Sequence, residues 1–553
     1  MNLSKITWTR RSFMKKSSFA VFTVLFSSIF KTFNGKVFGQ SKSGKKVVVI
    51  GSGLTGLCTA AILARQNYDV TVLEANPTFI GGHSRTYEIG GLSFCVGPQY
   101  VWNFGEEEIG AQVLQYLNLD NQIRFNRMDT NAFENFIIGS SMPLPIPMGL
   151  GKFEAAAAQQ YPASRKGISK FFSVISDLYK ATIIMERKGM YLYEGNKAIL
   201  DIAFDTDISL GSKLAMLKYN KYSLDDLLTS CGLEGEVRRY LYGHSGVFAE
   251  NQSEISVVIY AAATGSYHSG AFVPEKGFGS LVEALCQTIK KYNGTILPGK
   301  RVMKIINDGE FATSVSCADN SQYDCDIVIS NQSPRLTCKM LNNCKLSQYH
   351  YKPSNSLVSC FIVLRDSEKI RKTLRLKNYW WQDSNAVVDF NKPDMNKMPT
   401  MLFISSPSAN FSSPASSLEN DSMVIFIPGN FEQSKRMKEQ GDVAYQQFKA
   451  QVAENIVTIL NDKVFPGIND KIVSVQVETP WDIHLLTGAE DGNVYGKRLT
   501  AQSVLSNQYG TIMKIRNLYI GCSTIGLPGV ATCFRTATII CRKISGLKIE
   551  SPT

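Results

Sequence analysis

Three glycines and one acid near the start of the chain have the types and spacing needed to hold a dinucleotide. The stretch VVVIGSGLTG, residues 47–56, contains Gly51, Gly53 and Gly56, and Glu74 follows 18 residues after the last of them. The first glycine permits a tight turn, the second lets the backbone approach a pyrophosphate at a helix N-terminus, and the third lets the helix pack closely. Glu74 is placed to accept hydrogen bonds from the ribose hydroxyls of an adenosine.

The elements that must position these residues are predicted around them. The β-branched run at 47–50 is typical of a strand buried on both faces, and DVTVLE at 69–74 predicts a second strand. The small and aliphatic residues between them favour a helix packed tightly on a sheet. Because strand, glycines, helix, strand and acid occur in this order, we predict a βαβ dinucleotide-binding unit. No second GxGxxG follows a strand, so one nucleotide is expected.

A second pair of glycines begins seven residues after Glu74, in GGHSRT at 81–86. This segment offers an amide-rich turn, with Arg85 as a partner for a phosphate. A simple turn at Gly81 and Gly82 is the alternative interpretation.

A hairpin is predicted directly after this turn. Residues alternate in TYEI and LSFC around Gly90 and Gly91, and the hairpin delivers the loop GPQY at 97–100. Tyr100 and Trp102 are interpreted as ordinary core or wall aromatics, with a chemical role as the alternative.

Taken together, VVVIGSGLTG and VLEANPTFIGGHSRT resemble the start of the flavin-containing amine oxidase and phytoene desaturase superfamily. In that family the second glycine pair lies along the diphosphate and ribityl part of FAD, and a loop like 97–100 passes close to the flavin ring. This sequence has His83 where many members have Arg. The resemblance implies one non-covalently bound FAD.

Two C-terminal stretches resemble the carotenoid desaturase, carotenoid isomerase and retinol saturase type of this superfamily. TPWDIHLLTGAEDGNVYG at 479–496 is similar to its Thr-Pro start and Gly-x-x-Tyr-Gly finish. Residues 517–544 are similar to its last strand, flavin-facing loop and closing helix. A helix from Val530 presents its positive dipole end to the N1/C2 edge of a reduced flavin. Cys522 stands where several relatives have an acid, and Arg535-Thr536 replaces a common Ser-Gly.

The resemblance implies an α/β chain, α+β overall, with a Rossmann-like FAD-binding domain of the glutathione-reductase type. This domain is discontinuous, at 45–125, 270–335 and 480–550, and a substrate-binding domain occupies 126–269 and 336–479. A strand near Val302 is expected to pair with the adenine. The residues predicted to contact FAD are Gly51, Gly53, Leu54, Thr55, Gly56, Glu74, Ala75, Gly81, Gly82, His83, Ser84, Arg85, Gly97, Pro98, Gln99, Tyr100, Val302, Gly521, Cys522, Gly529, Val530 and Ala531.

The first 40 residues have a different composition from the rest of the chain. They contain seven Lys and Arg and no acid, so the formal charge of +12 leaves 12 − 7 = +5 for the other 513 residues. TRRSFMK at 9–15 resembles a twin-arginine export signal. The uncharged stretch after Lys16, about 14 residues, is shorter than the ~20 that span a bilayer as a helix. We expect export across the inner membrane to the periplasm or its outer face, with cleavage near Gln40; an N-terminal membrane anchor is the alternative.

The net charge and the spacing of the cysteines and histidines argue against a nucleic-acid-binding protein and a metalloprotein. A charge of +5 without a basic stripe does not indicate a nucleic-acid-binding protein. The twelve cysteines form no CxxC pair and the five histidines lie far apart, so no metal site is expected and the thiols are predicted to be free and buried.

No nucleophile, paired carboxylate or triad has a spacing that indicates a catalytic residue, so the chemistry is assigned to the flavin. We predict an FAD-dependent oxidoreductase acting on C=C bonds of an apolar polyene or lipid, by desaturation, saturation or isomerisation. The electron acceptor is oxygen or a membrane quinone, or none for an isomerase, and the pocket is expected to open near a membrane. The alternatives are an amine or amino-acid oxidase, which needs an aromatic cage or a charged anchor, and a flavin-binding protein without turnover.

Overall fold

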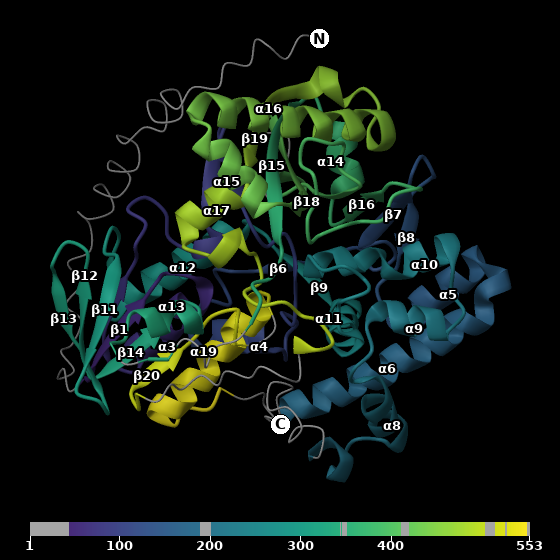
Figure 1. The fold of residues 1–553 in the computed structure, drawn as a ribbon. Coiled ribbons are helices and arrows are strands. Elements are labelled where there is room, and N and C mark those ends of the chain that lie inside the picture. Colours follow the sequence, from purple (N-terminus) through teal and green to yellow (C-terminus); the bar gives the residue numbers. More distant parts are fainter. Residues whose placement is uncertain are drawn as a thin grey trace.

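The computed structural model describes residues 44–188, 201–342, 344–345, 351–410, 420–503, 515–525 and 528–549. The predicted export signal at 1–40 lies outside these residues. Figure 1 shows a nucleotide-binding part at the lower left, a second large sheet at the top and a group of helices at the right.

A five-stranded parallel sheet gathers segments that are far apart in the sequence. Its order is β10-β2-β1-β14-β20, and every neighbouring pair is parallel. The strands are β1 (Lys46–Ile50), β2 (Asp69–Leu73), β10 (Thr295–Leu297), β14 (Ile327–Ser330) and β20 (Leu518–Ile520). The β-branched residues of β1 are buried on both faces, as expected for a central parallel strand. The predicted Rossmann-like fold class is confirmed.

Three long helices cover this sheet. Helix α3 (Leu54–Arg65) packs against both α12 (Phe278–Lys291) and α19 (Val530–Ser545). Eleven of the twelve residues of α3 are buried, which explains why the segment is rich in small and aliphatic side chains. An antiparallel sheet, β11 (Val302–Asn307), β12 (Ala312–Cys317) and β13 (Gln322–Asp324), stands beside them at the left of Figure 1.

The second sheet has seven strands in the order β19-β15-β18-β17-β16-β7-β8. Only β16 and β7 pair in parallel. The strands are β7 (Glu134–Ile138), β8 (Leu144–Ile146), β15 (Ser356–Arg365), β16 (Asn378–Gln382), β17 (Met401–Ser405), β18 (Asn420–Gly429) and β19 (Ile472–Glu478). The apolar side of α16 (Asp442–Ile459) packs on this sheet.

The remaining helices surround these sheets. They are α4 (Ile109–Tyr116), α5 (Leu150–Gln160), α6 (Arg165–Arg187), α8 (Leu210–Tyr219), α9 (Leu224–Ser230), α10 (Gly235–Tyr242), α11 (Val257–Ser269), α13 (Pro334–Lys339), α14 (Glu368–Leu374), α15 (Phe431–Glu439) and α17 (Pro480–Thr487). Among the described helices, none is long and apolar enough to cross a bilayer.

The predicted hairpin forms and connects the two parts. Strands β3 (Thr86–Ile89) and β4 (Leu92–Cys95) pair through Ile89 and Leu92, and Gly90 and Gly91 make the turn with φ of 60° and 78°. Phe94 of β4 contacts Phe361 of β15 with ring centroids 5.7 Å apart. A small sheet of β5 (Val101–Trp102), β9 (Ala271–Pro274) and β6 (Phe125–Arg127) lies after the hairpin.

The cysteines differ in part from the sequence prediction. Cys338 and Cys344 form a disulfide, so the prediction of free thiols is wrong for this pair; the other ten cysteines are free. The two cysteines are six residues apart, so they form no CxxC pair in the sequence, but the fold brings their Cα atoms to within 5.3 Å.

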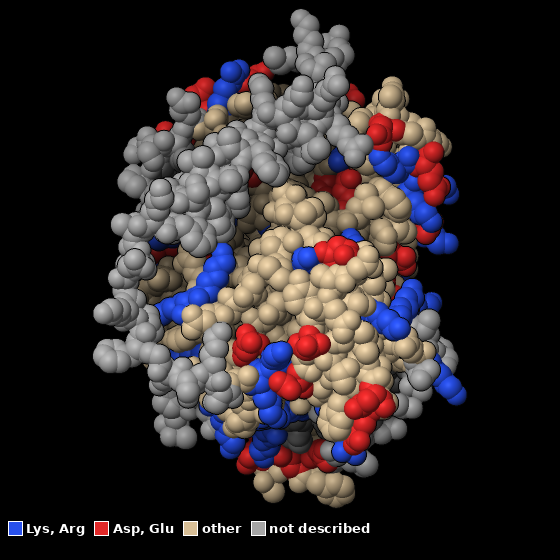
Figure 2. Space-filling model, turned by 90° about the vertical axis from the view of Figure 1, so that its left-hand side faces the viewer, with Lys and Arg blue, Asp and Glu red and all other residues tan. Residues whose placement is uncertain are grey.

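The surface charge is mixed. On the face in Figure 2, Lys and Arg side chains are interspersed with Asp and Glu.

Candidate active site

One cavity of about 860 Å³ contains nearly all of the predicted FAD contacts. Of the 22 residues, only Gly56 and Gly521 do not line it. These two glycines permit close packing behind the cavity. A Cβ on Gly56 would lie 2.6 Å from the Gly51 carbonyl oxygen, and one on Gly521 would lie 2.9 Å from Thr55 Cγ2. The size is within the range of sites for organic ligands.

The two glycine segments form a cradle at the N-terminus of α3. Gly51 has φ +93° and Gly82 has φ +58°. A Cβ on Gly82 would lie only 3.3 Å from Gly53 Cα, so the two segments approach each other closely. Gly53 forms a parallel bridge with Gly81. Gly53, Leu54 and Thr55 at the start of α3 line the cavity, so the positive end of the helix dipole faces it, a favourable setting for a diphosphate.

Gly53 has a neighbour that sequence reasoning missed. A Cβ on Gly53 would collide with the side-chain amide of Asn331. Asn331 follows β14 directly and also lies close to Gly51 and Gly56. The order of strands in the sheet, which places β14 beside β1, brings it there.

Glu74 lies at the carboxyl end of β2, where it lines the cavity. Its carboxylate accepts hydrogen bonds from Ser52 N at 2.8 Å, Ser52 Oγ at 2.5 Å and Asn76 N at 2.7 Å. These contacts fix the carboxylate beside the glycine cradle. Val302, predicted to meet the adenine, lines the same cavity.

Arg85 lines the cavity and has a counter-charge within the protein. Its guanidinium is buried and pairs with Glu478 of β19, with Nη2 2.5 Å from Oε1. Nη1 donates to the Gly82 carbonyl, and the Tyr87 hydroxyl donates to the other Glu478 oxygen at 2.6 Å. A carboxylate 393 residues away in sequence thus neutralises Arg85. Its contact with a phosphate stays a prediction.

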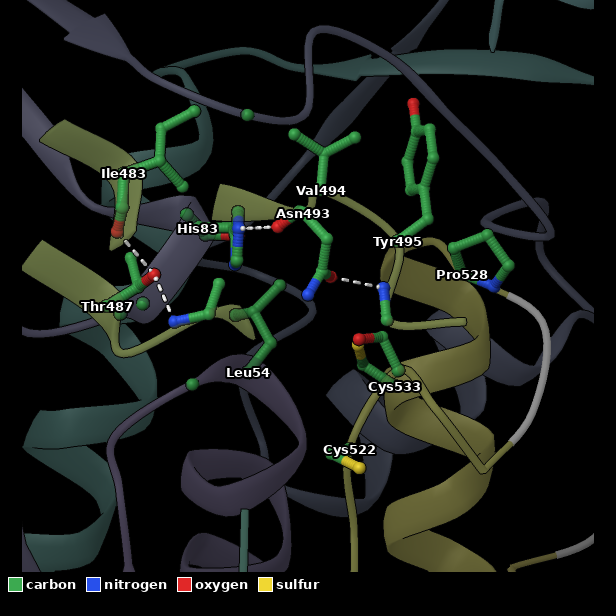
Figure 3. Close-up of a pocket in the computed structure, with 18 of the residues that line it drawn as sticks. Leu54, His83, Ile483, Thr487, Asn493, Val494, Tyr495, Cys522, Pro528 and Cys533 are labelled. Carbon is green, nitrogen blue, oxygen red and sulfur yellow. Dashed lines mark hydrogen bonds between the residues drawn. The ribbon is translucent and has the colours of Figure 1, made fainter. Parts of the chain in front are cut away.

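His83 and Cys522 are uncharged at neutral pH. The His83 Nε2 lies 3.1 Å from the Asn493 carbonyl oxygen (Figure 3). Burial, reinforced by the charge of Arg85, lowers the His83 pKa to about 4. Burial raises the Cys522 pKa to about 11. Neither side chain brings a positive charge to a phosphate.

The N-terminus of α19 forms a further part of the cavity wall. Gly529 caps this helix with φ +120°, and a Cβ there would lie 2.7 Å from the Trp102 indole. Val530 and Ala531 in its first turn line the cavity, as does Cys522 of the preceding loop. The C-terminal helix thus starts against an aromatic wall.

We call this part of the cavity the aromatic chamber. Its rings are in mutual contact: Tyr100 stacks on Tyr267 with centroids 4.6 Å apart, and Trp380 lies 4.7 Å from Phe403. Tyr100 and Trp102 both lie in the wall of this cavity. The chamber is lined by Tyr100, Trp102, Val247, Phe248, Ile259, Ala263, Tyr267, Leu357, Trp380, Met401, Phe403, Phe426, Val494 and Tyr495, and none of these side chains carries a formal charge at neutral pH.

A carboxyl group that the sequence did not indicate lies behind this wall. Glu134, the first residue of β7, is fully buried and accepts a hydrogen bond from Trp380 Nε1 at 2.5 Å. The Tyr100 hydroxyl also donates to it. Burial raises the Glu134 pKa to about 8, although both hydrogen bonds oppose the shift. The only sequence signal was an acid opening the otherwise uncharged strand ENFII.

A family model described as flavin containing amine oxidoreductase matches residues 54–355, which is 302 of 553 residues. The chain belongs to this family. The predicted superfamily and the prediction of an FAD-dependent oxidoreductase are confirmed.

Characterised relatives are similar over most of their length. An all-trans-retinol 13,14-reductase of Danio rerio is 23% identical over 90% of this chain and 85% of its own. A 1-hydroxycarotenoid 3,4-desaturase of Flavobacterium sp. (strain P99-3) is 23% identical over 90% of this chain and 98% of its own. A chloroplastic prolycopene isomerase of Daucus carota is 23% identical over 91% of this chain and 81% of its own.

A solved structure of putrescine oxidase shares the fold. It superposes with a TM-score of 0.61 at 13% identity, covering 91% of this chain and 99% of that chain. At this identity the likeness supports the fold alone.

Proposed function

We propose that this family member binds FAD non-covalently and acts on C=C bonds of an apolar polyene or lipid. The uncharged aromatic chamber beside the nucleotide cradle carries this proposal, because an apolar substrate gains binding energy from such walls. Relatives named for retinol reduction, carotenoid desaturation and prolycopene isomerisation support it.

The residues present fit an extended dinucleotide. Glu74 and Val302 would hold the adenosine, and the cradle at Gly53 and Gly81 would hold the diphosphate. The N-terminus of α19 and the loop at 97–100 would face the flavin ring. The flavin supplies hydride-transfer chemistry when bound. The protein orients the substrate and keeps water from it.

Amine oxidation is the second candidate, because the chamber also has the form of an aromatic cage. A cationic amine needs an anionic anchor inside the cage. Glu134 is the nearest acid described here, but it lies behind Tyr100 and Trp380 and is protonated at neutral pH. This arrangement favours the apolar substrate.

The test is to incubate the flavin-loaded protein with retinoids, carotenoids, polyunsaturated fatty acids and primary amines, in air and without oxygen. A change in the absorption spectrum of a polyene is the expected result. A change that requires no acceptor indicates isomerisation, and one that requires oxygen or a quinone indicates desaturation. Peroxide formation with amines alone would refute the proposal. No change in any substrate together with no change in the flavin spectrum would indicate a protein without turnover.

We propose that the N-terminal segment directs export to the periplasm or the outer face of the inner membrane. A twin-arginine receptor recognises the guanidinium pair and not charge alone. Replacing both Arg10 and Arg11 by Lys is therefore expected to retain the protein in the cytoplasm, as measured by cell fractionation. The matched control replaces Lys15 and Lys16 by Arg. Unchanged export of the first variant would contradict the proposal and indicate another route or a simple anchor.

We also propose peripheral contact with an anionic membrane through α8. Leu210, Leu214 and Leu217 share one face of this helix and are 72%, 56% and 48% exposed. Residues 210–222 also contain three lysines and no acid. Exposed leucines between lysines suit the interface of an anionic bilayer.

The change Leu210→Ser with Leu214→Ser is expected to reduce sedimentation of the protein with vesicles that contain phosphatidylglycerol by roughly tenfold. Val443→Ser serves as the control, because Val443 is 74% exposed on α16. Equal sedimentation of all three proteins would contradict the proposed surface.

A further inference from the structure

We propose that Tyr100, Tyr267 and Glu134 form a proton relay to a substrate carbon in the aromatic chamber, a role that rests on the proposed function. Tyr100 and Tyr267 line the cavity, whereas Glu134 lies behind them. A substrate in the chamber would therefore touch the phenols and not the carboxyl group.

The three side chains are continuous. The rings of Tyr100 and Tyr267 stack with an interplanar angle of 29°, and their hydroxyls are hydrogen-bonded to each other. The Tyr100 hydroxyl also contacts the Glu134 carboxyl group, whose Oε2 accepts from Trp380. Three separate elements supply the relay: the loop after β4, helix α11 and strand β7.

The surroundings keep all three groups protonated. The Glu134 pKa is raised to about 8 by burial, and burial raises the pKa of both phenols well above its usual range. Tyr495, from the segment after α17, is the further titratable group that faces the two phenols. At neutral pH the cluster is a neutral acid beside an apolar chamber, and it has a proton to donate.

Saturation of a C=C bond requires such a proton. The O–H bond of Tyr100 breaks, and the π electron pair forms a C–H bond with that proton at one carbon. Bound reduced flavin would supply the hydride that the neighbouring carbon requires. The Tyr100 phenolate then takes the proton of Glu134, and the resulting carboxylate is reprotonated from solvent. Desaturation runs these steps in reverse: Glu134 first releases its proton and takes the proton of Tyr100, and the Tyr100 phenolate then removes the proton from the substrate carbon. Glu134 thus acts through Tyr100 as a positioning and proton-supplying residue.

The test compares wild type with Tyr100→Phe, Glu134→Gln and Tyr260→Phe. Tyr260 is the matched control because it is a buried tyrosine outside the cavity whose hydroxyl donates to the Leu241 carbonyl. In D₂O we expect one relay-derived solvent deuterium in each saturated product, or exchange of solvent deuterium into recovered substrate for desaturation. Tyr100→Phe is expected to lower the rate and the deuterium uptake on the order of 10²-fold. Flavin content and polyene KM are expected to stay within about twofold of wild type, as for the control.

The pH dependence provides a readout that a purely structural role would not produce. As pH rises through about 8, where Glu134 loses its proton, the wild-type rate of saturation is expected to fall and that of desaturation to rise, and Glu134→Gln is expected to be slow without this inflection. Flavin-free protein gives an independent measurement. Because folded Glu134 holds a proton that the unfolded chain releases, wild-type stability relative to Glu134→Gln should fall between about pH 4.5 and pH 8.

The outcomes separate the relay from the proposed function. Polyene turnover in wild type with unchanged rates in Tyr100→Phe and Glu134→Gln would overturn the relay and leave the function standing. An equal loss in Tyr260→Phe would also overturn it. No polyene turnover in wild type would refute both, while the stability titration would still report whether Glu134 is neutral.

Discussion

Gly53→Val is expected to yield a folded protein that purifies without flavin. Gly53 has φ −64°, which valine adopts without strain, so the backbone tolerates the change. The new Cβ collides with the Asn331 amide, and its methyl groups extend toward the cradle that would hold the diphosphate. Overpacking of this kind costs about 1–3 kcal/mol, or roughly tenfold to hundredfold in affinity. The measurement is flavin absorbance per mole of protein after gel filtration.

The control for this experiment is Gly151→Val in α5. A Cβ on Gly151 has nothing within 4 Å, and the residue is exposed. This variant is expected to retain the yellow colour and the wild-type melting temperature. A fully loaded Gly53→Val protein would show that the cradle does not hold the diphosphate, and recovery of FMN instead of FAD would contradict the assignment of Glu74 to an adenosine.

Glu478→Gln is expected to lower the free energy of unfolding by about 3–5 kcal/mol, because it leaves the buried Arg85 guanidinium without a counter-charge. Glu478 and Arg85 are 6% and 2% exposed, so water does not replace the lost partner. The pair joins the second glycine segment to β19. Denaturant unfolding followed by circular dichroism measures the change.

Two further variants test whether the unpaired charge of Arg85 causes the loss of stability. Glu368→Gln removes the same charge from a surface pair with Lys372, in which the side chains are 66% and 75% exposed, and should give no measurable change. Replacing Arg85 and Glu478 together by Leu should be less destabilising than Glu478→Gln, because no buried charge is left unpaired. Equal stability of wild type and Glu478→Gln would contradict the role assigned to this pair.

The nucleotide-binding half was predictable because its signals are local. The βαβ unit at 46–73, the hairpin at 86–95 and the helix from Val530 each follow from consecutive residues with a clear period, turn or cap. Their order along the chain also implied one parallel sheet. The structure brings all but two of the predicted FAD contacts to one cavity for this reason.

The chemistry of the substrate side depended on the tertiary structure. The pairing of Arg85 with Glu478 could not be predicted, because the two residues lie 393 positions apart and no local pattern joins them. Glu134 and Tyr100 carry no spacing that relates them; β-sheet register and the path of the loop after the hairpin place them in contact. Burial then decides their protonation. The sequence by itself determined the βαβ unit and its glycine turns, since these depend on backbone conformation in a short motif. Only the folded chain decided which side chains face the substrate and which of them hold a proton, because burial and charge pairing arise between residues distant in sequence.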